Sequence, residues 1–273
     1  MPHLLYVVDP MCSWCFGFAP ALKEARAQSS AQPLPESTEK ASHATPARLP
    51  VELVMGGLAP DSDEPMPAEM RAYVQQAWHA VTARTGVEFE HRFWQECAPR
   101  RSTYPACRAV IAAGFLEQRA RGSRKPATLP HAPAAESAAT NPPNSQHATP
   151  RTPQFEASYP DFGPMLWLDA KPGEMLHAIQ HAYYRDAQNP SDADTLIECA
   201  AAIGFDRQAF AAQLEAYETE RALQAHLARR RALGADSFPT VGMVHQGKER
   251  VVIGGCVSAG ELGKAVHEVL RTL

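Results

Sequence analysis

Residues 9–20 read Asp9-Pro-Met-Cys-Ser-Trp-Cys-Phe-Gly-Phe-Ala-Pro20 and contain two cysteines, Cys12 and Cys15, three positions apart. The apolar run before them, from Leu4 to Val8, is short, rich in branched and aromatic residues, and closed by Asp-Pro, which predicts a buried strand. The residues after Cys15 have a helical pattern, so the pair is expected to open a helix at the end of that strand. Unpaired backbone N–H groups and the positive end of the helix dipole favour a thiolate there, which indicates redox chemistry.

The composition is that of an ordinary globular protein and argues against two classes of partner. The chain has 273 residues, of which 45% are hydrophobic and 21% charged, with a net charge of −4. This weakly acidic balance gives no reason to expect nucleic acid or an anionic membrane as a partner. No stretch approaches the ~20 apolar residues of a membrane span. Residues 1–3 lack the positive region of a signal peptide, and the apolar run after them is too short for its core.

A cytoplasmic location is therefore expected, and it decides how the cysteines are interpreted. Structural disulfides are rare in that compartment. The six cysteines are interpreted as thiols, with one pair as the redox-active centre, rather than as three structural bridges.

The expected elements place strands at both ends of the chain and helices between them. In chain order they are a strand at 4–8, a helix at 13–28, a strand at 51–55, helical patterns over 67–118 and 173–233, strands at 240–244 and 250–253 around a turn at Gly247, and a helix at 259–271. A β-α-β unit is right-handed and parallel, whereas the terminal hairpin is antiparallel. The predicted fold class is therefore α/β, with a mixed central sheet (β-α-β then β-β-α) interrupted by a large helical insertion.

Two tracts rich in Pro, Ser, Ala and Thr complete the predicted domain organisation. Residues 29–50 and 119–164 have low hydrophobicity and many helix breakers, which predicts a flexible insertion and a disordered or loosely attached tract. The first domain is expected to be discontinuous and to comprise 1–58 and 235–273. The helical insertion domain is expected to comprise 59–234.

The spacing of the two cysteines suits thiol–disulfide exchange. At positions i and i+3 of a helical turn both sulfurs lie on one face. Cys12 is nearer the helix end and is expected to be the exposed nucleophile, whereas Cys15 is one turn deeper and suits the resolving role. The thiolate of Cys12 attacks a substrate disulfide, and Cys15 then displaces the mixed disulfide. Zinc binding is a competing interpretation, but a structural site needs four ligands and no second pair has matched spacing; an inert pair of buried thiols is another.

Four stretches carry a resemblance to a known family. They are residues 9–18, Val54-Met-Gly-Gly-Leu58, Pro105-Ala-Cys-Arg-Ala109 and Gly234-Ala-Asp-Ser-Phe-Pro-Thr240. Together they resemble the DsbA-like branch of the thioredoxin-fold oxidoreductases, most closely its cytoplasmic FrnE-like members. The resemblance implies a thioredoxin fold interrupted by a helical domain, with Cys12 as nucleophile and Cys15 as resolving thiol.

The same resemblance implies two further site residues. It identifies Pro239 as a cis-proline beside the cysteine pair, which leaves the backbone of Phe238 free to pair with an extended substrate peptide. The alternative is an ordinary trans proline at a strand start. The long tracts at 29–50 and 119–164 and the extra thiol of Cys256 depart from typical relatives.

Two residues within the motif are secondary candidates. Trp14 lies between the cysteines and is expected to be exposed, touching substrate and tuning the reduction potential, with simple packing as the alternative. Asp9 is a candidate proton relay for Cys15 if it is buried. An aspartate before a proline is otherwise a turn former.

The remaining cysteines and one histidine pair are interpreted mainly as structural. Cys107 and Cys199 fall on apolar helix faces and are expected in the core. A Cys97–Cys107 disulfide and a regulatory role for Cys256 are left open. Two histidines, at 177 and 181, have the spacing of a metal pair but lack the glutamate of His-Glu-x-x-His, so an exposed helix face is preferred and no metal site is predicted.

The sequence thus predicts a protein disulfide oxidoreductase or isomerase. Its expected partners are disulfide-containing proteins or small-molecule thiols. It is expected to use no metal or bound organic cofactor, and glutathione is a candidate redox partner. Neither the direction of electron flow nor the oligomeric state follows from these residues.

Two other functions compete with this prediction. Glutathione-dependent isomerases and transferases of the kappa and 2-hydroxychromene-2-carboxylate isomerase types share the fold. They usually carry serine at the position of Cys12 and lack the resolving cysteine. The other alternative is a non-enzymatic redox-sensing interaction module whose thiols switch partner binding.

Overall fold

A computed structural model of the chain describes residues 2–29, 49–122 and 163–272. The flexible insertion predicted at 29–50 lies outside these residues except at its two ends. The loosely attached tract predicted from residue 119 was placed too early, because helix continues through Gly122. The rest of that prediction, at 123–162, lies outside the described residues.

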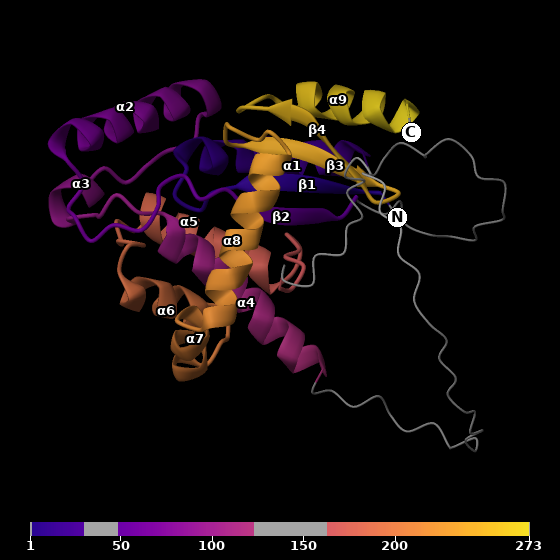
Figure 1. Ribbon diagram of the computed structural model, residues 1–273. Coiled ribbons are helices and arrows are strands. Elements are labelled where there is room, and N and C mark those ends of the chain that lie inside the picture. The colour runs from indigo at the N-terminus through magenta and orange to yellow at the C-terminus, as the bar shows by residue number, and fades with distance from the viewer. Residues whose placement is uncertain (1, 30–48, 123–162, 273) are drawn as a thin grey trace, which may run out of the picture.

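Four strands form one mixed sheet in the order β2-β1-β3-β4 (Figure 1). They are β1 (His3–Val8), β2 (Val51–Met55), β3 (Thr240–His245) and β4 (Lys248–Gly254). β1 pairs in parallel with β2 and antiparallel with β3, and β3 pairs antiparallel with β4. The β3–β4 turn has positive φ at Gln246 and Gly247, as a tight hairpin requires. The mixed sheet and the terminal hairpin predicted from sequence are confirmed.

The helices lie between and after these strands. They are α1 (Ser13–Ser29), α2 (Ala68–Thr85), α3 (Phe93–Glu96), α4 (Tyr104–Gly122), α5 (Lys171–Tyr184), α6 (Ala193–Ala202), α7 (Arg207–Leu214), α8 (Tyr217–Ala232) and α9 (Ala259–Arg271). The single helical pattern seen over 67–118 is thus divided among α2, α3 and α4. In no described part of the chain does a helix combine the length and apolarity needed to span a membrane.

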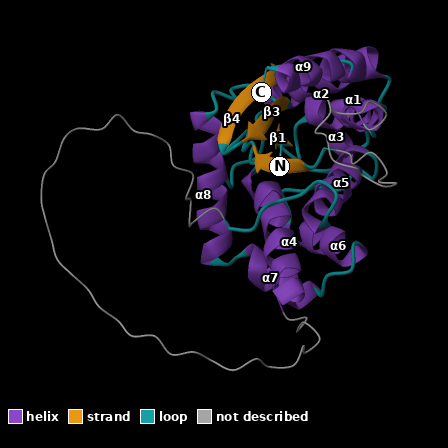
Figure 2. Cartoon of the chain, turned by 90° about the vertical axis from the view of Figure 1, so that its right-hand side faces the viewer, coloured by secondary structure: helices purple, strands orange, loops and turns teal. Residues whose placement is uncertain are grey.

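The two strands β1 and β2 are buried on both sides, and helices lie on both faces of the sheet there, whereas β4 is mostly exposed. Along β1, Leu4, Tyr6 and Val8 join the large core that includes α1 and α9. Leu5 and Val7 point to the other face and form a smaller cluster near the end of α8. Figure 2 shows α8 and α9 on opposite sides of the strands. This layering holds both ends of β1 rigidly, including the end that leads into α1.

The helical block contacts the sheet domain along α1 and α8. Gly17 lies in the interior of α1, where an added Cβ would be 2.4 Å from Cγ1 of Val81 on α2, so this glycine permits the close approach of the two helices. The predicted division puts α8 in the helical insertion domain and β2 in the first domain, although α8 packs directly on β2. The division stays a prediction.

Buried charges fix α8 to the sheet. Glu52 on β2 is 4% exposed. Its carboxylate accepts hydrogen bonds from Nη1 and Nη2 of Arg229 at 2.6 and 3.0 Å, and it lies 3.1 Å from Nε2 of His3. Arg229 also donates from Nε to Glu249 on β4 at 2.9 Å. The hydrogen bonds of Glu52 with His3 and Arg229, together with the charge of Arg229, lower the pKa of Glu52 to about 2, because they outweigh the desolvation of its carboxylate.

Candidate functional site

The cysteine pair lies at the junction of β1 and α1, as the sequence predicted. Cys12 directly precedes the first helical residue, and its carbonyl accepts a hydrogen bond from the amide of Phe16 at 3.1 Å. This is the N-cap position, next to the unpaired N–H groups of the first turn. No acidic side chain lies in that turn to oppose the positive end of the helix.

The expectation that Cys12 is exposed was wrong. Its side chain is only 6% exposed, because Phe238 and the segments that line a neighbouring cavity close over it. Its Sγ atom lies 3.9 Å from the carbonyl oxygen of Phe238. Cys12 therefore meets its surroundings through the cavity rather than through an open surface.

Cys15 lies one turn deeper and is fully buried. Burial raises the pKa of its thiol well above the ordinary value. A hydrogen bond to the sulfur of Cys12 and the proximity of that group raise the pKa of Cys15 further, whereas a hydrogen bond from the main chain of Asp9 lowers it. Neither cysteine is in a disulfide. The pair thus combines a sulfur at a cavity wall with a protonated thiol behind it.

Asp9 is fully buried behind the pair and accepts four hydrogen bonds. Oδ1 accepts from the amide of Met11 at 2.8 Å. Oδ2 accepts from the amide of Leu58 and the hydroxyl of Thr103, both at 2.6 Å, and from the thiol of Cys107 at 3.7 Å. Burial raises the pKa of Asp9, although these neutral donors oppose the shift. Its carboxylate ties together the start of α1, the loop after β2 and the start of α4.

The proton relay proposed for Asp9 has a limited structural basis. Within the described residues, no hydrogen bond joins its carboxylate to Cys15; only the main chain of Asp9 does so. The carboxylate is buried, as a relay requires. The relay stays a proposal.

Phe238 and Pro239 lie beside Cys12, on the loop between α8 and β3. The peptide bond between them is cis. The ring of Phe238 packs against Gly56, where an added Cβ would lie 2.7 Å from Cε1 of Phe238. The guanidinium of Arg230, on α8, lies 5.5 Å from the centroid of the same ring. These contacts fix the ring, and with it the carbonyl that faces Cys12.

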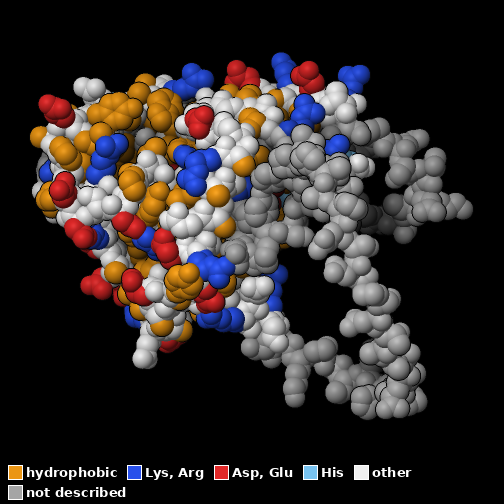
Figure 3. Space-filling view, in the orientation of Figure 1, with side chains coloured by type: hydrophobic (Ala, Val, Ile, Leu, Met, Phe, Trp, Pro, Cys, Tyr) orange, Lys and Arg blue, Asp and Glu red, His pale blue; other side chains and the backbone are white. Residues whose placement is uncertain are grey.

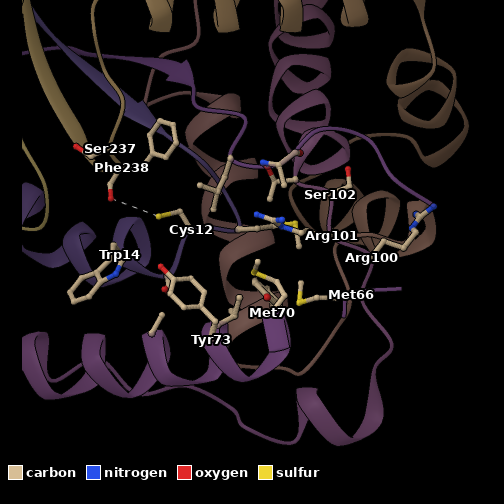
Figure 4. A pocket seen from close by; sticks show the side chains of 18 of the residues that line it. Cys12, Trp14, Met66, Met70, Tyr73, Arg100, Arg101, Ser102, Ser237 and Phe238 are labelled. Atoms are coloured by element: carbon tan, nitrogen blue, oxygen red, sulfur yellow. Dashed lines mark hydrogen bonds between the residues drawn. The ribbon is translucent and has the colours of Figure 1, made fainter. Parts of the chain in front are cut away.

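A cavity of about 350 Å³ opens next to Cys12. One wall comes from α2 and the short segment before it, with Met66, Met70 and Tyr73, and Trp14 on α1 lines the cavity as well (Figure 4). Trp14 is half-buried rather than exposed as expected. Hydrophobic side chains also gather on the α2 side of the molecular surface (Figure 3). The cavity has the size and apolar lining of a small binding site.

The other cysteines are free thiols. Cys107 and Cys199 are buried, as predicted, and the alternative of a Cys97–Cys107 disulfide is wrong, because the thiol of Cys97 donates instead to the carbonyl of Ala187 at 3.2 Å. Cys256 is half-buried, and burial raises the pKa of its thiol.

No metal site is evident among the residues that the structure describes. There, no three His, Cys, Asp or Glu side chains gather closely enough to hold an ion. His177 and His181 are both exposed, as the sequence favoured, and His181 lies 2.9 Å from a carboxylate oxygen of Asp186.

Sequence reasoning missed the residues that converge on Asp9 and the cavity from the helical block. Thr103 and Arg101 precede α4, far from the cysteines in the chain. Leu58 and Cys107 both lie in stretches that carried the family resemblance, so those stretches held the signal. Nothing in the local pattern indicated that they meet at one carboxylate.

No family model matches the sequence, and a search of the curated proteins also finds no match. Solved structures do share its fold. A candidate protein disulfide isomerase from Nitrosomonas europaea aligns with a TM-score of 0.67 and 20% identity, over 99% of this chain and 98% of the other. The cytosolic disulfide reductase DsbM from Pseudomonas aeruginosa aligns with a TM-score of 0.58 and 20% identity, over 99% and 100% of the two chains.

A second structure of DsbM contains glutathione and aligns with a TM-score of 0.56. The chain therefore has the DsbA-like thioredoxin fold that its sequence stretches predicted.

Proposed function

We propose that this chain is a thiol–disulfide oxidoreductase in which Cys12 is the nucleophile and Cys15 the resolving thiol. The observation that carries the proposal is the position of the two sulfurs. Cys12 lies at an N-cap and lines a cavity, while Cys15 is buried behind it and hydrogen-bonded to it. A fold shared with disulfide oxidoreductases supports the same activity.

The reaction proceeds in two exchange steps. The sulfur of Cys12, as thiolate, attacks one sulfur of a substrate disulfide; a mixed disulfide forms, and the other half of the substrate leaves as a thiolate. Cys15 then gives up its proton and attacks the sulfur of Cys12, which releases the second half. Two electrons pass to the substrate, and the pair becomes a disulfide. The reverse sequence oxidises a dithiol substrate.

The surroundings of the pair assign roles to the other residues. The carbonyl of Phe238, 3.9 Å from Sγ of Cys12, accepts a hydrogen bond from the backbone of an extended substrate and aligns its disulfide with that sulfur. Trp14 packs against the bound substrate from the wall formed by α1. Asp9 receives the proton of Cys15, directly or through its own hydrogen-bond partners.

The proposed partners are thiol compounds. The structure of DsbM with glutathione supports glutathione as the redox partner, and the description of DsbM as cytosolic supports a cytoplasmic location. No resident metal or organic cofactor takes part in the proposed steps.

The test is exchange with glutathione disulfide, measured by the glutathione released. Replacing Cys12 with serine removes the attacking sulfur, so exchange should be abolished. Cys97→Ser is the matched control, because this thiol is half-buried, does not line the cavity and donates to the carbonyl of Ala187, so the variant should exchange like the wild type. Wild-type rates in Cys12→Ser would refute the assignment.

A further inference from the structure

The cavity next to Cys12 is apolar on most of its wall but has a polar side. Arg100, Arg101 and Ser102 lie there, between α3 and α4, across the cavity from Cys12 (Figure 4). Two arginines, Arg100 and Arg101, occupy neighbouring positions in this segment. Their environments differ, and the difference indicates what the cavity binds.

Arg100 is held by groups outside the cavity. Its Nη1 lies 2.9 Å from a carboxylate oxygen of Asp63, and its Nη2 donates to the carbonyl of Ser191. Its side chain points away from Cys12 (Figure 4). This arginine joins the loop before α2 to the loop before α6 and is not available to a ligand.

Arg101 has no such partner in the part of the chain that the structure describes. It is exposed, it lines the cavity, and its guanidinium extends toward Cys12 (Figure 4). Two acids of this region are already matched: Asp61 accepts from Arg108 at 2.9 Å, and Asp9 is surrounded by its own four donors. Asp236 also lines the cavity, on the segment that leads to Phe238, and no hydrogen bond or ion pair joins its exposed carboxylate to Arg101 in the structure.

A guanidinium in this position suits one kind of ligand group. It presents a rigid fork of N–H donors that matches a carboxylate in bidentate geometry. The wall formed by Met66, Met70 and Tyr73 offers an apolar surface to the rest of such a ligand. A carboxylate at Arg101 would place the rest of the ligand between that residue and Cys12.

We propose that Arg101 is a carboxylate-binding subsite, and that preferred substrates carry a carboxylate close to the reacting disulfide. This inference rests on the proposed function, because it needs Cys12 as the reacting sulfur. Two sources can supply the group, namely a small disulfide such as glutathione disulfide or an acidic residue next to a cysteine in a polypeptide. The recognition chemistry is the same for both.

The test compares two aromatic disulfide reagents of opposite character. The reagent 5,5′-dithiobis(2-nitrobenzoate) carries a carboxylate on each ring, and 4,4′-dithiodipyridine carries none. In both reactions the sulfur of Cys12 forms a bond to one sulfur of the reagent and the reagent's S–S bond breaks. The other half leaves as the thionitrobenzoate anion or, after taking up a proton, as 4-thiopyridone, and each is followed by its absorbance. Cys15 then gives up its proton and attacks the sulfur of Cys12, which releases the second half. The rate to measure is that of the kinetic phase of reagent consumption that is present in the wild type and absent in Cys12→Ser.

Arg101→Met should slow this phase about tenfold with the dicarboxylate reagent, the usual scale for losing one charge-assisted hydrogen bond. The rate with the neutral reagent should change less than twofold, and Arg101→Lys should recover part of the loss. Arg121→Gln, an arginine paired with Glu117 on the far end of α4, is the control and should match the wild type with both reagents.

The outcomes separate this inference from the proposed function. Equal slowing with both reagents, or no slowing with either, would overturn the carboxylate subsite while leaving the exchange activity intact. If no phase depends on Cys12 in the wild type, the proposed function itself fails.

The source of the carboxylate is distinguished by two further substrates. Glutathione disulfide is compared with a disulfide-linked peptide that has glutamate beside its cysteine, and with the glutamine version of that peptide. The subsite predicts that Arg101→Met slows the glutathione disulfide reaction, the glutamate-peptide reaction or both, and leaves the glutamine-peptide reaction unchanged. Equal slowing with the two peptides would contradict it.

Discussion

Two buried acids, Asp9 just after β1 and Glu52 within β2, have opposite environments. Both are at most 4% exposed. Glu52 faces the guanidinium of Arg229, and its pKa is about 2. Asp9 faces only neutral donors, and burial raises its pKa. A nearby cation thus decides whether a buried carboxyl is held as a fixed anion or left able to take up a proton. The carboxylate of Glu52 anchors α8, whereas the carboxyl group of Asp9 lies behind the cysteine pair.

The largest effect is expected from removing the cation beside Glu52. Arg229→Met leaves a buried carboxylate without its main partner, which costs about 3–5 kcal/mol in the free energy of unfolding. Urea denaturation measures the loss. The double variant Glu52→Gln/Arg229→Met removes both charges and should lose less than the single variant. A single-variant loss below about 1 kcal/mol would show that this cluster is not a fixed ion pair.

The next largest effect is expected in how the contribution of Glu52 to stability depends on pH. The pKa of Glu52 is lower in the folded than in the unfolded chain, so its contribution is present above pH ~4.5 and is lost as the pH falls toward 2. The full contribution is about 3 kcal/mol. The stability advantage of the wild type over Glu52→Gln should therefore shrink across this range in urea titrations. An advantage that does not change with pH would contradict the low pKa.

Asp9 should show the opposite sign. Its folded pKa is raised, so the folded chain binds a proton more tightly than the unfolded chain, and stability falls as the pH rises through that pKa. Asp9→Asn places an amide N–H₂ against existing donors and should cost about 2 kcal/mol at pH 7. The wild-type advantage over this variant should grow on acidification, measured by the same urea titrations. A shrinking advantage would mean that Asp9 is a fixed anion like Glu52.

The smallest effect is expected at Phe238, whose carbonyl faces Cys12 and whose ring faces Arg230 of α8. Gly56→Ala brings a methyl group to 2.7 Å from that ring, and the guanidinium of Arg230 on α8 lies 5.5 Å from the ring centroid. We expect a loss of about 1 kcal/mol in stability and slower exchange with glutathione disulfide, because the carbonyl facing Cys12 shifts. Gly260→Ala on α9, where an added Cβ would meet no atom within 4 Å, is the matched control. Unchanged exchange in Gly56→Ala would separate Phe238 from the reaction.

Much of the fold followed from local pattern, because strands and helix starts are specified by neighbouring residues. Val51–Met55 was predicted with its observed bounds, and the capping box of Ser258 and Glu261 begins α9 where expected. The division of 67–118 into three helices was missed. Gly86 ends α2 in the left-handed conformation, but aromatic residues continue beyond it and prolong the apolar pattern.

The candidate site was only half predictable. Cys12 and Cys15 are one local motif, and Phe238 and Pro239 followed from resemblance. The contact of Thr103 with Asp9 joins residues 94 positions apart, and no local pattern encodes it. The burial of Cys12 has the same origin, since much of the cavity wall over it comes from α2 and from the segment before α4.

The most direct test of the account traps the first exchange product. Without the resolving thiol, the mixed disulfide on Cys12 cannot be displaced. Cys15→Ala treated with glutathione disulfide should therefore accumulate one glutathione adduct, which peptide mapping by mass spectrometry should locate on Cys12. An adduct confined to another cysteine, or no adduct at all, would contradict the claim that Cys12 attacks and Cys15 resolves.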